Sequence, residues 1–385
     1  MLKRRIYDDE HEMFRRTVRA WAEKEVFPFA EDWREAGCVS REVWKKAGDE
    51  GFLCMFAEEK YGGLGLQDFR YDMILCEEIG PFEPGLFIGL HNRVVGPYLH
   101  KVASVEQRDR FMPGVVSGET ILAIAMTEPD TGSDLAAIRT RAVDMGDHWL
   151  LNGTKTFISN GILAGLVLVA ARTNPEASHE VGLFWVEDGT PGFTRGRNLK
   201  KVGLESQDTA ELFFDNVKVP KANVLGDPRG GFRTMMTNLA EERLIGSVGF
   251  MARAEHAFKI TRDFILQRRA FGRPIGTFQN SRFKMASMRT ELDAGWALVD
   301  HCVREHLEGV LSAEMAAEVK LFSSEVEGRV VDECLQLHGG AGYMDEYQIS
   351  RHYRDARISR IYAGTSEIMR EIIGRGLGLD ERAQR

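Results

Sequence analysis

Two adjacent charged residues, Glu242 and Arg243, fall on the apolar face of a predicted helix. With about 100° of rotation per residue, Glu242 lies about −60° and Arg243 about +40° from Leu239, the centre of that face. Glu241 lies at about 200°, on the side predicted to face water. Burial of a carboxylate is costly unless it is paired or takes part in chemistry. Glu242 is therefore predicted either to form an internal ion pair, with Arg243 or another base, or to act as a catalytic acid or base with a shifted pKa.

The composition is that of a globular protein: 385 residues, 43% hydrophobic and 28% charged, enough for two or three domains. The net charge of −8 argues against a nucleic acid or a membrane surface as partner. The five cysteines are scattered without a CxxC pair, so we predict no disulfide framework, no metal site and a reducing compartment. The sequence shows no apolar signal core and no run long enough to span a bilayer. We expect a cytoplasmic protein without a membrane span.

Hydrophobic periodicity divides the chain into three parts. Residues 1–121 carry apolar residues at spacings of three and four, which predicts helices separated by glycine and proline breaks. Residues 122–230 contain segments typical of strands, with Asn152-Gly153 where a hairpin turn is expected. Residues 231–385 return to helix. The predicted fold class is α+β, mostly α, with a helical, a β and a second helical domain in that order.

Five loop segments carry glycine, hydroxyl or basic residues that suit a bound anion or polar ring. A helix cap, a tight turn or a core aromatic explains each segment when it is taken alone. The segments are 125–134 (AMTEPDTGSD), 157–161 (FISNG), 268–279 (RRAFGRPIGTFQ), 336–340 (QLHGG) and 361–368 (IYAGTSEI). The chain has no GxGxxG after a strand, no P-loop and no nucleophile elbow.

Taken together and in this order, TEPDTGSD, NGTKTFISNG, RRAFGRPIGTFQ, QLHGGAGY and YAGTSEIMR closely resemble the acyl-CoA dehydrogenase family of flavoenzymes, over essentially the whole chain. The resemblance implies an N-terminal helical domain, a central β-barrel-like domain and a C-terminal four-helix bundle. It implies FAD as cofactor and a homotetramer built as a dimer of dimers. The implied reaction is α,β-dehydrogenation of a long-chain or methyl-branched acyl-CoA to the trans-2-enoyl-CoA, with an electron-transfer flavoprotein as partner.

The resemblance assigns the base of this reaction to Glu242. Many members place the catalytic glutamate immediately before a Gly-Thr pair, but this chain has Ala363 there, which cannot take a proton. The isovaleryl-CoA and long-chain branches place it on a helix directly before an arginine, and Glu242-Arg243 matches that position. The backbone N–H of Ala363 would then stabilise the enolate, as a donor of an oxyanion hole does.

The resemblance also implies contacts with the cofactor and the thioester. The residues implied to surround the flavin are Ile124, Met126, Thr127, Gly132, Ser133, Phe157, Ile158, Ser159, Thr365 and Glu367. Those implied for the adenosine diphosphate half, partly across a subunit interface, are Arg268, Phe271, Phe278, Gln279, Gln336, Leu337, His338, Gly339 and Gly340. Those implied for the CoA thioester are Ser133, Arg243, Ala363 and Gly364.

Some features leave alternatives open. Ala240 stands where relatives often carry an aspartate, and Arg233 where some have a tyrosine, so the CoA contacts are not fixed. Gly246 and Gly249, one and two turns beyond Glu242, are predicted to leave space for a long acyl tail. An alternative function on the same fold is an acyl-CoA oxidase or a flavin monooxygenase. An alternative of another class is a non-catalytic helical scaffold in which the buried charges only pair.

Overall fold

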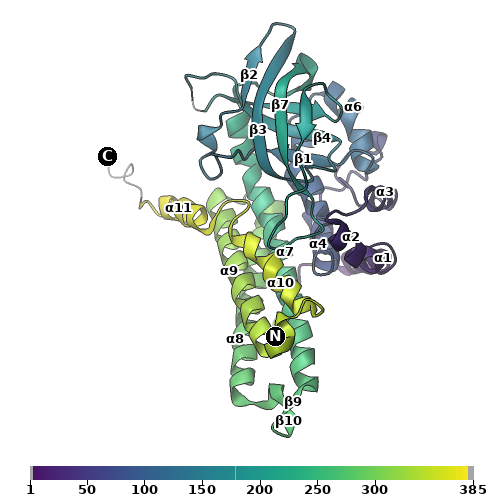
Figure 1. Ribbon diagram of the computed structural model, residues 1–385, viewed down its shortest axis with the longest axis vertical. Coiled ribbons are helices and arrows are strands. Elements are labelled where there is room, and N and C mark those ends of the chain that lie inside the picture. Colours follow the sequence, from purple (N-terminus) through teal and green to yellow (C-terminus); the bar gives the residue numbers. More distant parts are fainter. Residues whose placement is uncertain (1–2, 178, 380–385) are drawn as a thin grey trace.

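The computed structural model describes residues 3–177 and 179–379. Within these residues, an eight-stranded sheet lies at one end of the molecule, the N-terminal helices pack beside it, and the long helices α7, α8 and α9 run away from it as a stem (Figure 1). The predicted class, α+β with mostly helix, is confirmed. None of the helices in the described ranges combines the length and hydropathy needed to cross a membrane.

The N-terminal part is helical, and side-chain caps fix where several helices begin. Asp8 accepts the His11 N–H at the start of α1, and Ser104 forms a reciprocal capping box with Gln107 at the start of α6. The elements are α1 (Asp9–Glu25), α2 (Ala30–Ala36), α3 (Arg41–Asp49), α4 (Phe69–Ile79), a π-helical turn (Leu90–Val95), α5 (Gly96–Lys101) and α6 (Val105–Val116).

The middle part is a sheet with strand order β6-β7-β3-β2-β4-β5-β8, and β1 pairs in parallel with β4. The two end strands, β6 and β8, do not pair with each other in the described residues, so the sheet is open and strand pairing does not close the implied barrel. The strands are β1 (Leu122–Ala125), β2 (Arg141–Asp144), β3 (His148–Ser159), β4 (Leu166–Arg172), β5 (Val181–Glu187), β6 (Phe193–Arg195), β7 (Thr209–Pro220) and β8 (Val224–Leu225).

The hairpin turn predicted at Asn152-Gly153 was wrong. Both residues lie inside β3, at a shift in its register with β7. A Cβ on Gly153 would lie 2.4 Å from the Thr140 Oγ1, so the glycine permits close approach of two chain segments rather than a reversal.

The C-terminal part forms the stem. Helix α7 packs against both α8 and α9, and the shorter α10 packs against α9 and α7. A two-stranded hairpin closes the far tip of the stem (Figure 1). The elements are α7 (Gly231–Gln267), β9 (Arg269–Ala270), β10 (Arg273–Pro274), α8 (Gln279–Leu307), α9 (Ala313–His338), α10 (Gln348–Ala356) and α11 (Ser366–Gly376).

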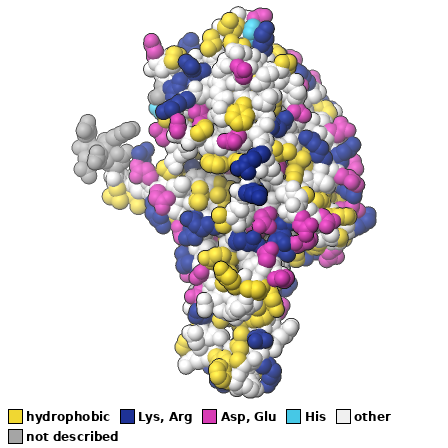
Figure 2. Space-filling view, viewed as in Figure 1, with side chains coloured by type: hydrophobic (Ala, Val, Ile, Leu, Met, Phe, Trp, Pro, Cys, Tyr) yellow, Lys and Arg dark blue, Asp and Glu magenta, His cyan; other side chains and the backbone are white. Residues whose placement is uncertain are grey.

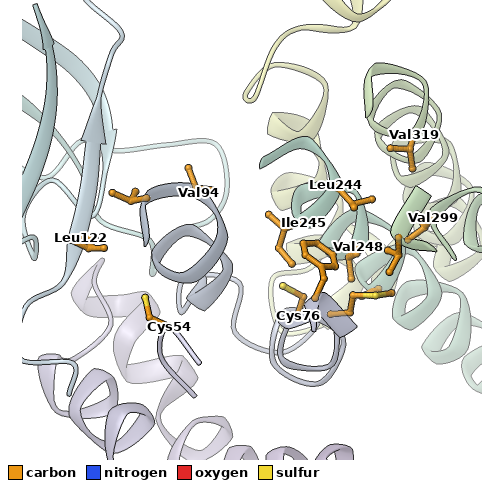
Figure 3. Packing of buried hydrophobic residues seen from close by; sticks show 14 of the residues in the cluster. Cys54, Cys76, Val94, Leu122, Leu244, Ile245, Val248, Val299 and Val319 are labelled. Carbon is orange, nitrogen blue, oxygen red and sulfur yellow. The ribbon is translucent and has the colours of Figure 1, made fainter. Parts of the chain in front are cut away.

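The middle of helix α7 has no solvent-exposed face, because it contacts α4, the π-helical turn, α8 and α9. Leu244, Ile245 and Val248 point from α7 into a core shared with Cys76 of α4 and Val299 of α8 (Figure 3). The prediction that Glu241 faces water was therefore wrong: its exposed fraction is 5%. The helical-wheel argument assumed one solvated side, and tertiary packing removes it.

Leu244 is fully buried in this core, whereas Leu64 is 55% exposed. We expect Leu244→Ala to lower the free energy of unfolding by roughly 2–5 kcal/mol, because it removes buried methyl groups and leaves a cavity. Leu64→Ala makes the same chemical change at the surface and should alter it by less than about 0.5 kcal/mol. Chemical denaturation of both variants measures the difference, and equal effects would contradict the described packing of α7.

Candidate active site

Glu242 lies buried on α7 with an exposed fraction of 7%. The Tyr98 hydroxyl and Asn238 Nδ2 both donate to its Oε1 at 3.3 Å, and Asn238 also binds the Val94 carbonyl at 3.0 Å. Burial, opposed by the hydrogen bonds from Asn238 and Tyr98, raises the pKa of Glu242 to about 7. Such a carboxyl group exchanges a proton near neutral pH, which is what a general base requires.

The adjacent carboxyl group, Glu241, has the opposite environment. It lies 3.2 Å from Arg93 Nη1 and 2.7 Å from Lys101 Nζ, and Arg93 also pairs with Asp72 at 2.6 Å. Burial opposes the ionisation of Glu241, but Arg93 and Lys101 outweigh it and lower its pKa. One of two neighbouring carboxyl groups is thus held ionised, and the other is held ready to take a proton.

The predicted ion pair of Glu242 is not formed: no Lys, Arg or His in the described residues lies within ion-pair distance of its carboxylate. Arg243 is also buried, and its Nε has no hydrogen-bond partner in the described residues. Its Nη2 lies 3.9 Å from the position of a Cβ on Gly364. The structure therefore places Arg243 beside the loop that contains Ala363 and Gly364, as the sequence predicted for a shared site.

This loop has a fixed, left-handed backbone. Ala363 has a φ of +53° and Gly364 one of +98°, and the Gly364 carbonyl accepts a 2.6 Å hydrogen bond from the Lys320 Nζ. In the described part of the chain, no acceptor takes the Ala363 N–H. Thr365 then caps α11 by accepting the Ile368 N–H, and Glu367 lies exposed in its first turn. A free backbone donor thus lies on the loop that Arg243 contacts.

The loop that follows β1 is anchored to β3 by a buried ion pair. Glu128 accepts from Lys155 Nζ at 2.8 Å and from the backbone N–H groups of Arg139 and Thr140. Lys155 also donates to the Met126 carbonyl at 2.9 Å. These contacts hold Met126 and Thr127 against β3. Gly132 and Ser133, further along the loop, are exposed.

Phe157 lies directly beside this loop, since the Thr156 N–H donates to the Thr127 carbonyl at 2.9 Å. It is 68% exposed with a φ of +58°, at a register shift between β3 and β7, while Ile158 is buried. A bulge with left-handed backbone is a strained conformation for a solvent-exposed aromatic residue, and strained residues of this kind are frequent at functional sites. The described aromatic rings include none that stacks on Phe157.

The residues predicted for the adenosine diphosphate half lie at the far tip of the stem. Arg268 follows α7 there, 26 residues beyond Glu242 and about 39 Å away along a helix rising ~1.5 Å per residue. Phe264 stacks on His338 at 4.2 Å between ring centres, which brings the ends of α7 and α9 together. The predicted residues of this group that are exposed are Arg268, Phe271, Gln279, Gln336, Gly339 and Gly340; Phe278 and Leu337 are half-buried and His338 is buried. Hydrophobic side chains line this part of the stem surface (Figure 2).

A narrow cavity with a volume of about 30 Å³ begins one turn beyond Glu242. Gly246 and Gly249 of α7 form one wall, and Tyr362, directly before Ala363, forms part of another. Most of the remaining lining is apolar: Leu75, Cys76, Ile79, Leu86, Phe87 and Ile88. The cavity therefore runs from the Glu242 turn along α7, as the prediction for Gly246 and Gly249 requires.

Sequence reasoning missed several residues that shape this site. Asn238 lies four residues before Glu242, and helical spacing alone brings their side chains together. Glu128 and Lys155 both lie in predicted motifs, TEPDTGSD and NGTKTFISNG, but nothing local indicates that they pair. Tyr98 comes from a separate helix, and no pattern in its own segment points to Glu242.

Sequence models of the N-terminal, middle and C-terminal domains of acyl-CoA dehydrogenases match residues 8–119, 123–217 and 229–378 of this chain. The chain belongs to the acyl-CoA dehydrogenase family. It is 42% identical to a mitochondrial long-chain specific acyl-CoA dehydrogenase from Sus scrofa, over 98% of this chain and 89% of that protein.

Solved structures of the acyl-CoA dehydrogenase family share the whole fold. An acyl-CoA dehydrogenase from Geobacillus kaustophilus is 46% identical with a TM-score of 0.96, covering 97% of this chain and 100% of that one. A glutaryl-CoA dehydrogenase from Mycobacterium smegmatis, in complex with FADH2, is 30% identical with a TM-score of 0.91, covering 98% and 96%.

The two adjacent carboxyl groups predict opposite effects of pH on stability. The pKa of Glu242 rises from 4.5 to about 7 on folding, so its contribution is complete below about pH 4.5 and is lost as the pH rises through about 7. We expect Glu242→Gln, which resembles the protonated acid, to match wild type near pH 4 and to exceed it by up to roughly 3 kcal/mol near pH 8.5. Thermal or chemical unfolding across this range measures the effect.

Glu241→Gln is the matched control. Because the pKa of Glu241 is lowered, its contribution is present at neutral pH and is lost on acidification. We expect this variant to be less stable than wild type by roughly 1–3 kcal/mol near pH 8, since it removes one of the two carboxylates that pair with the buried Arg93 and leaves only Asp72. Parallel pH profiles for wild type and Glu242→Gln would show that Glu242 has an ordinary pKa.

Proposed function

We propose that this protein is an FAD-dependent acyl-CoA dehydrogenase that converts long-chain or methyl-branched acyl-CoA thioesters to trans-2-enoyl-CoA. The single observation that carries the proposal is Glu242: a buried carboxyl group with a pKa near 7 that no cation of the described residues pairs, one helical turn before the apolar cavity lined by Gly246. An electron-transfer flavoprotein is the proposed electron acceptor, as for the family in general.

Glu242 would take the proton from the α-carbon of the acyl group. Its Oε1 is held by Tyr98 and Asn238, whereas Oε2 accepts no hydrogen bond from the described residues. The Oε2 atom would therefore accept the proton, while the two hydrogen bonds to Oε1 fix the orientation of the carboxylate. A pKa of about 7 makes Glu242 a stronger base than an ordinary carboxylate and keeps a large fraction deprotonated at neutral pH.

Ala363 would stabilise the charge that develops on the thioester oxygen. Its N–H has no acceptor in the described residues, and the left-handed backbone at Ala363 and Gly364 holds it in place together with the Lys320 hydrogen bond. A backbone donor does not depend on the side chain, so alanine serves where other members carry a glutamate. Arg243 next to this loop would bind the CoA portion, and Ser133 would approach it from the β1–β2 loop.

The residues around Phe157 fit a flavin. Phe157 is exposed, and no described aromatic ring stacks on it. The neighbouring loop carries the exposed Ser133 and also Gly132, where a Cβ would meet nothing within 4 Å. Together they leave open space beside β3. Thr127 and Ser159 would donate to the polar edge of the flavin, and Phe157 and Ile158 would cover one face. When bound, the flavin accepts the β-hydrogen as hydride, and the protein supplies orientation and electrostatics.

We propose that the adenosine diphosphate half is bound partly by a second copy of the chain. Arg268, Phe271, Gln279 and the 336–340 loop lie at the stem tip, and Arg268 follows α7 about 39 Å beyond Glu242 at ~1.5 Å per residue, so they are not next to Glu242 of the same chain. Phe271 is 95% exposed there with a left-handed φ of +49°, like Phe157. We place these residues against the cofactor of a neighbouring subunit in a homotetramer.

The first test is anaerobic bleaching of the flavin absorbance by a panel of acyl-CoAs, with wild type and Glu242→Gln side by side. Wild type is expected to bleach with long-chain or branched thioesters, at a rate that rises with pH through about 7 because the base must be unprotonated. Glu242→Gln is expected to keep FAD and to bleach at least about a hundredfold more slowly.

Equal bleaching of the variant and wild type would place the base elsewhere.

Admission of air separates the alternatives on this fold. A dehydrogenase stays reduced until an electron-transfer flavoprotein is added, whereas rapid reoxidation in air would identify an oxidase or a monooxygenase.

Arg268→Glu tests the shared cofactor site. We expect this variant to lose most of its FAD, because the charge reversal faces the phosphates of the cofactor. Arg262→Glu, an exposed arginine less than two turns earlier on α7, is the control and should keep its FAD. The flavin-to-protein absorbance ratio and the molecular mass in solution are measured together. Full FAD content in Arg268→Glu, or in a monomeric wild type, would contradict the shared site.

A further inference from the structure

The far end of the apolar cavity contains a buried cation, Arg253. It lines the cavity with an exposed fraction of 7%, and its Nε donates to Glu327 Oε1 at 2.7 Å. Its Nη2 is shielded from solvent and has no hydrogen-bond partner in the described residues. Its Nη1 lies 3.5 Å from the position of a Cβ on Gly249, which lines the same cavity. The guanidinium thus lies against the cavity wall with a donor left over.

A plain hydrocarbon tail gives this donor nothing to bind. A buried donor without an acceptor is costly, and few native groups are left so. The other side chains that line this cavity are mostly apolar, so Arg253 is not explained by solvation there. Its Nε is taken by the ion pair with Glu327, and the Tyr362 hydroxyl also accepts a hydrogen bond from the guanidinium, while Nη2 keeps no partner in the described residues. The remaining edge therefore calls for an oxygen atom on whatever occupies the cavity.

The local charge favours a neutral oxygen over a second carboxylate. Glu327 is fully buried against Arg253 and already balances its charge. The carboxyl group of Asp355 also interacts with Arg253, and burial raises the pKa of both acids despite that interaction. A carboxylate on the ligand would add a further negative charge to this group. A hydroxyl or carbonyl oxygen accepts a hydrogen bond from Nη2 without that penalty.

The position of Arg253 sets the place of the oxygen on the chain. Gly249 lies seven residues beyond Glu242, or about 10.5 Å along α7 at ~1.5 Å per residue. Because a C–C bond of ~1.5 Å advances an extended chain by about 1.25 Å, this distance spans about eight bonds. Counted from the α-carbon beside Glu242, the cavity places the guanidinium near the tenth carbon.

We propose that the preferred substrates are acyl-CoAs whose tail carries a neutral hydrogen-bond-accepting oxygen, a hydroxyl or carbonyl group, near the tenth carbon, where Arg253 binds it. This inference rests on the proposed function, since it takes the cavity as the acyl site, and it requires the narrow cavity to widen around the tail. It makes Arg253 a specificity-determining residue. Glu327 is a positioning residue that holds the guanidinium by its Nε.

The test compares decanoyl-CoA, 10-hydroxydecanoyl-CoA and decanedioyl-CoA on the FAD-containing enzyme with an artificial electron acceptor. Wild type is expected to show a kcat/KM for the hydroxy substrate at least about tenfold above that for decanoyl-CoA, because only the former satisfies the charged donor. The double variant Arg253→Met/Glu327→Leu removes both charges together, which avoids an unpaired buried carboxylate. It is expected to reverse the preference, through KM more than kcat. Ile88→Val, an apolar change in the same cavity, is the control and should keep the wild-type ratio.

Each outcome bears on one of the two proposals. Turnover of decanoyl-CoA without a preference for the hydroxy substrate, or with the same ratio in the double variant, overturns the role of Arg253 and means that water satisfies its donor. A preference for decanedioyl-CoA overturns the neutral oxygen. Absence of turnover and of flavin bleaching with every acyl-CoA, including longer and branched ones, instead overturns the proposed function.

Discussion

The burial of Glu242 without a counter-charge is the constraint on which the rest of the site depends. A carboxyl group moved from water to this environment keeps its negative charge only at a cost, which appears as the pKa near 7. The fold tolerates that cost because α7 is packed on every side and contributes Leu244, Ile245 and Val248 to the core. The neighbouring Glu241, paired with Arg93 and Lys101, ties the same turn of α7 to α5 and the π-helical turn. Stability and reactivity are thus divided between two consecutive residues.

Three separate structural elements hold the groups of the proposed active site. A helix carries Glu242, the proposed base, a left-handed loop presents the Ala363 N–H, and a strained bulge in β3 presents Phe157. The buried Glu128–Lys155 pair fixes the loop beside that bulge. Groups on rigid elements with locked supporting contacts keep their geometry better than groups on free loops, which suits a site that acts on two adjacent carbon atoms.

The sequence predicts the class of fold and the burial of Glu242, because helical periodicity and the order of five motifs depend on local pattern. The sequence-based predictions fail where tertiary packing determines the environment of a residue. The periodicity of one helix does not reveal how many neighbours surround that helix, so it wrongly predicts that Glu241 faces solvent. Asn152-Gly153 was read as a turn, although the glycine serves close contact with Thr140. Tyr98 and Arg253 reach the site from positions whose own segments show no chemical pattern, and only the folded structure brings them there.

The length of α7 between Glu242 and Arg268 has a genetic consequence if the cofactor is shared between copies. A chain with a damaged base still offers an intact stem tip to its neighbour, and a chain with a damaged tip still offers an intact base. Two such defective chains, co-expressed, would form mixed assemblies in which some sites receive both working halves. A defect in the base or in the stem tip would then be partly rescued by the partner chain in a mixed assembly. A single chain that carries both defects would not be rescued.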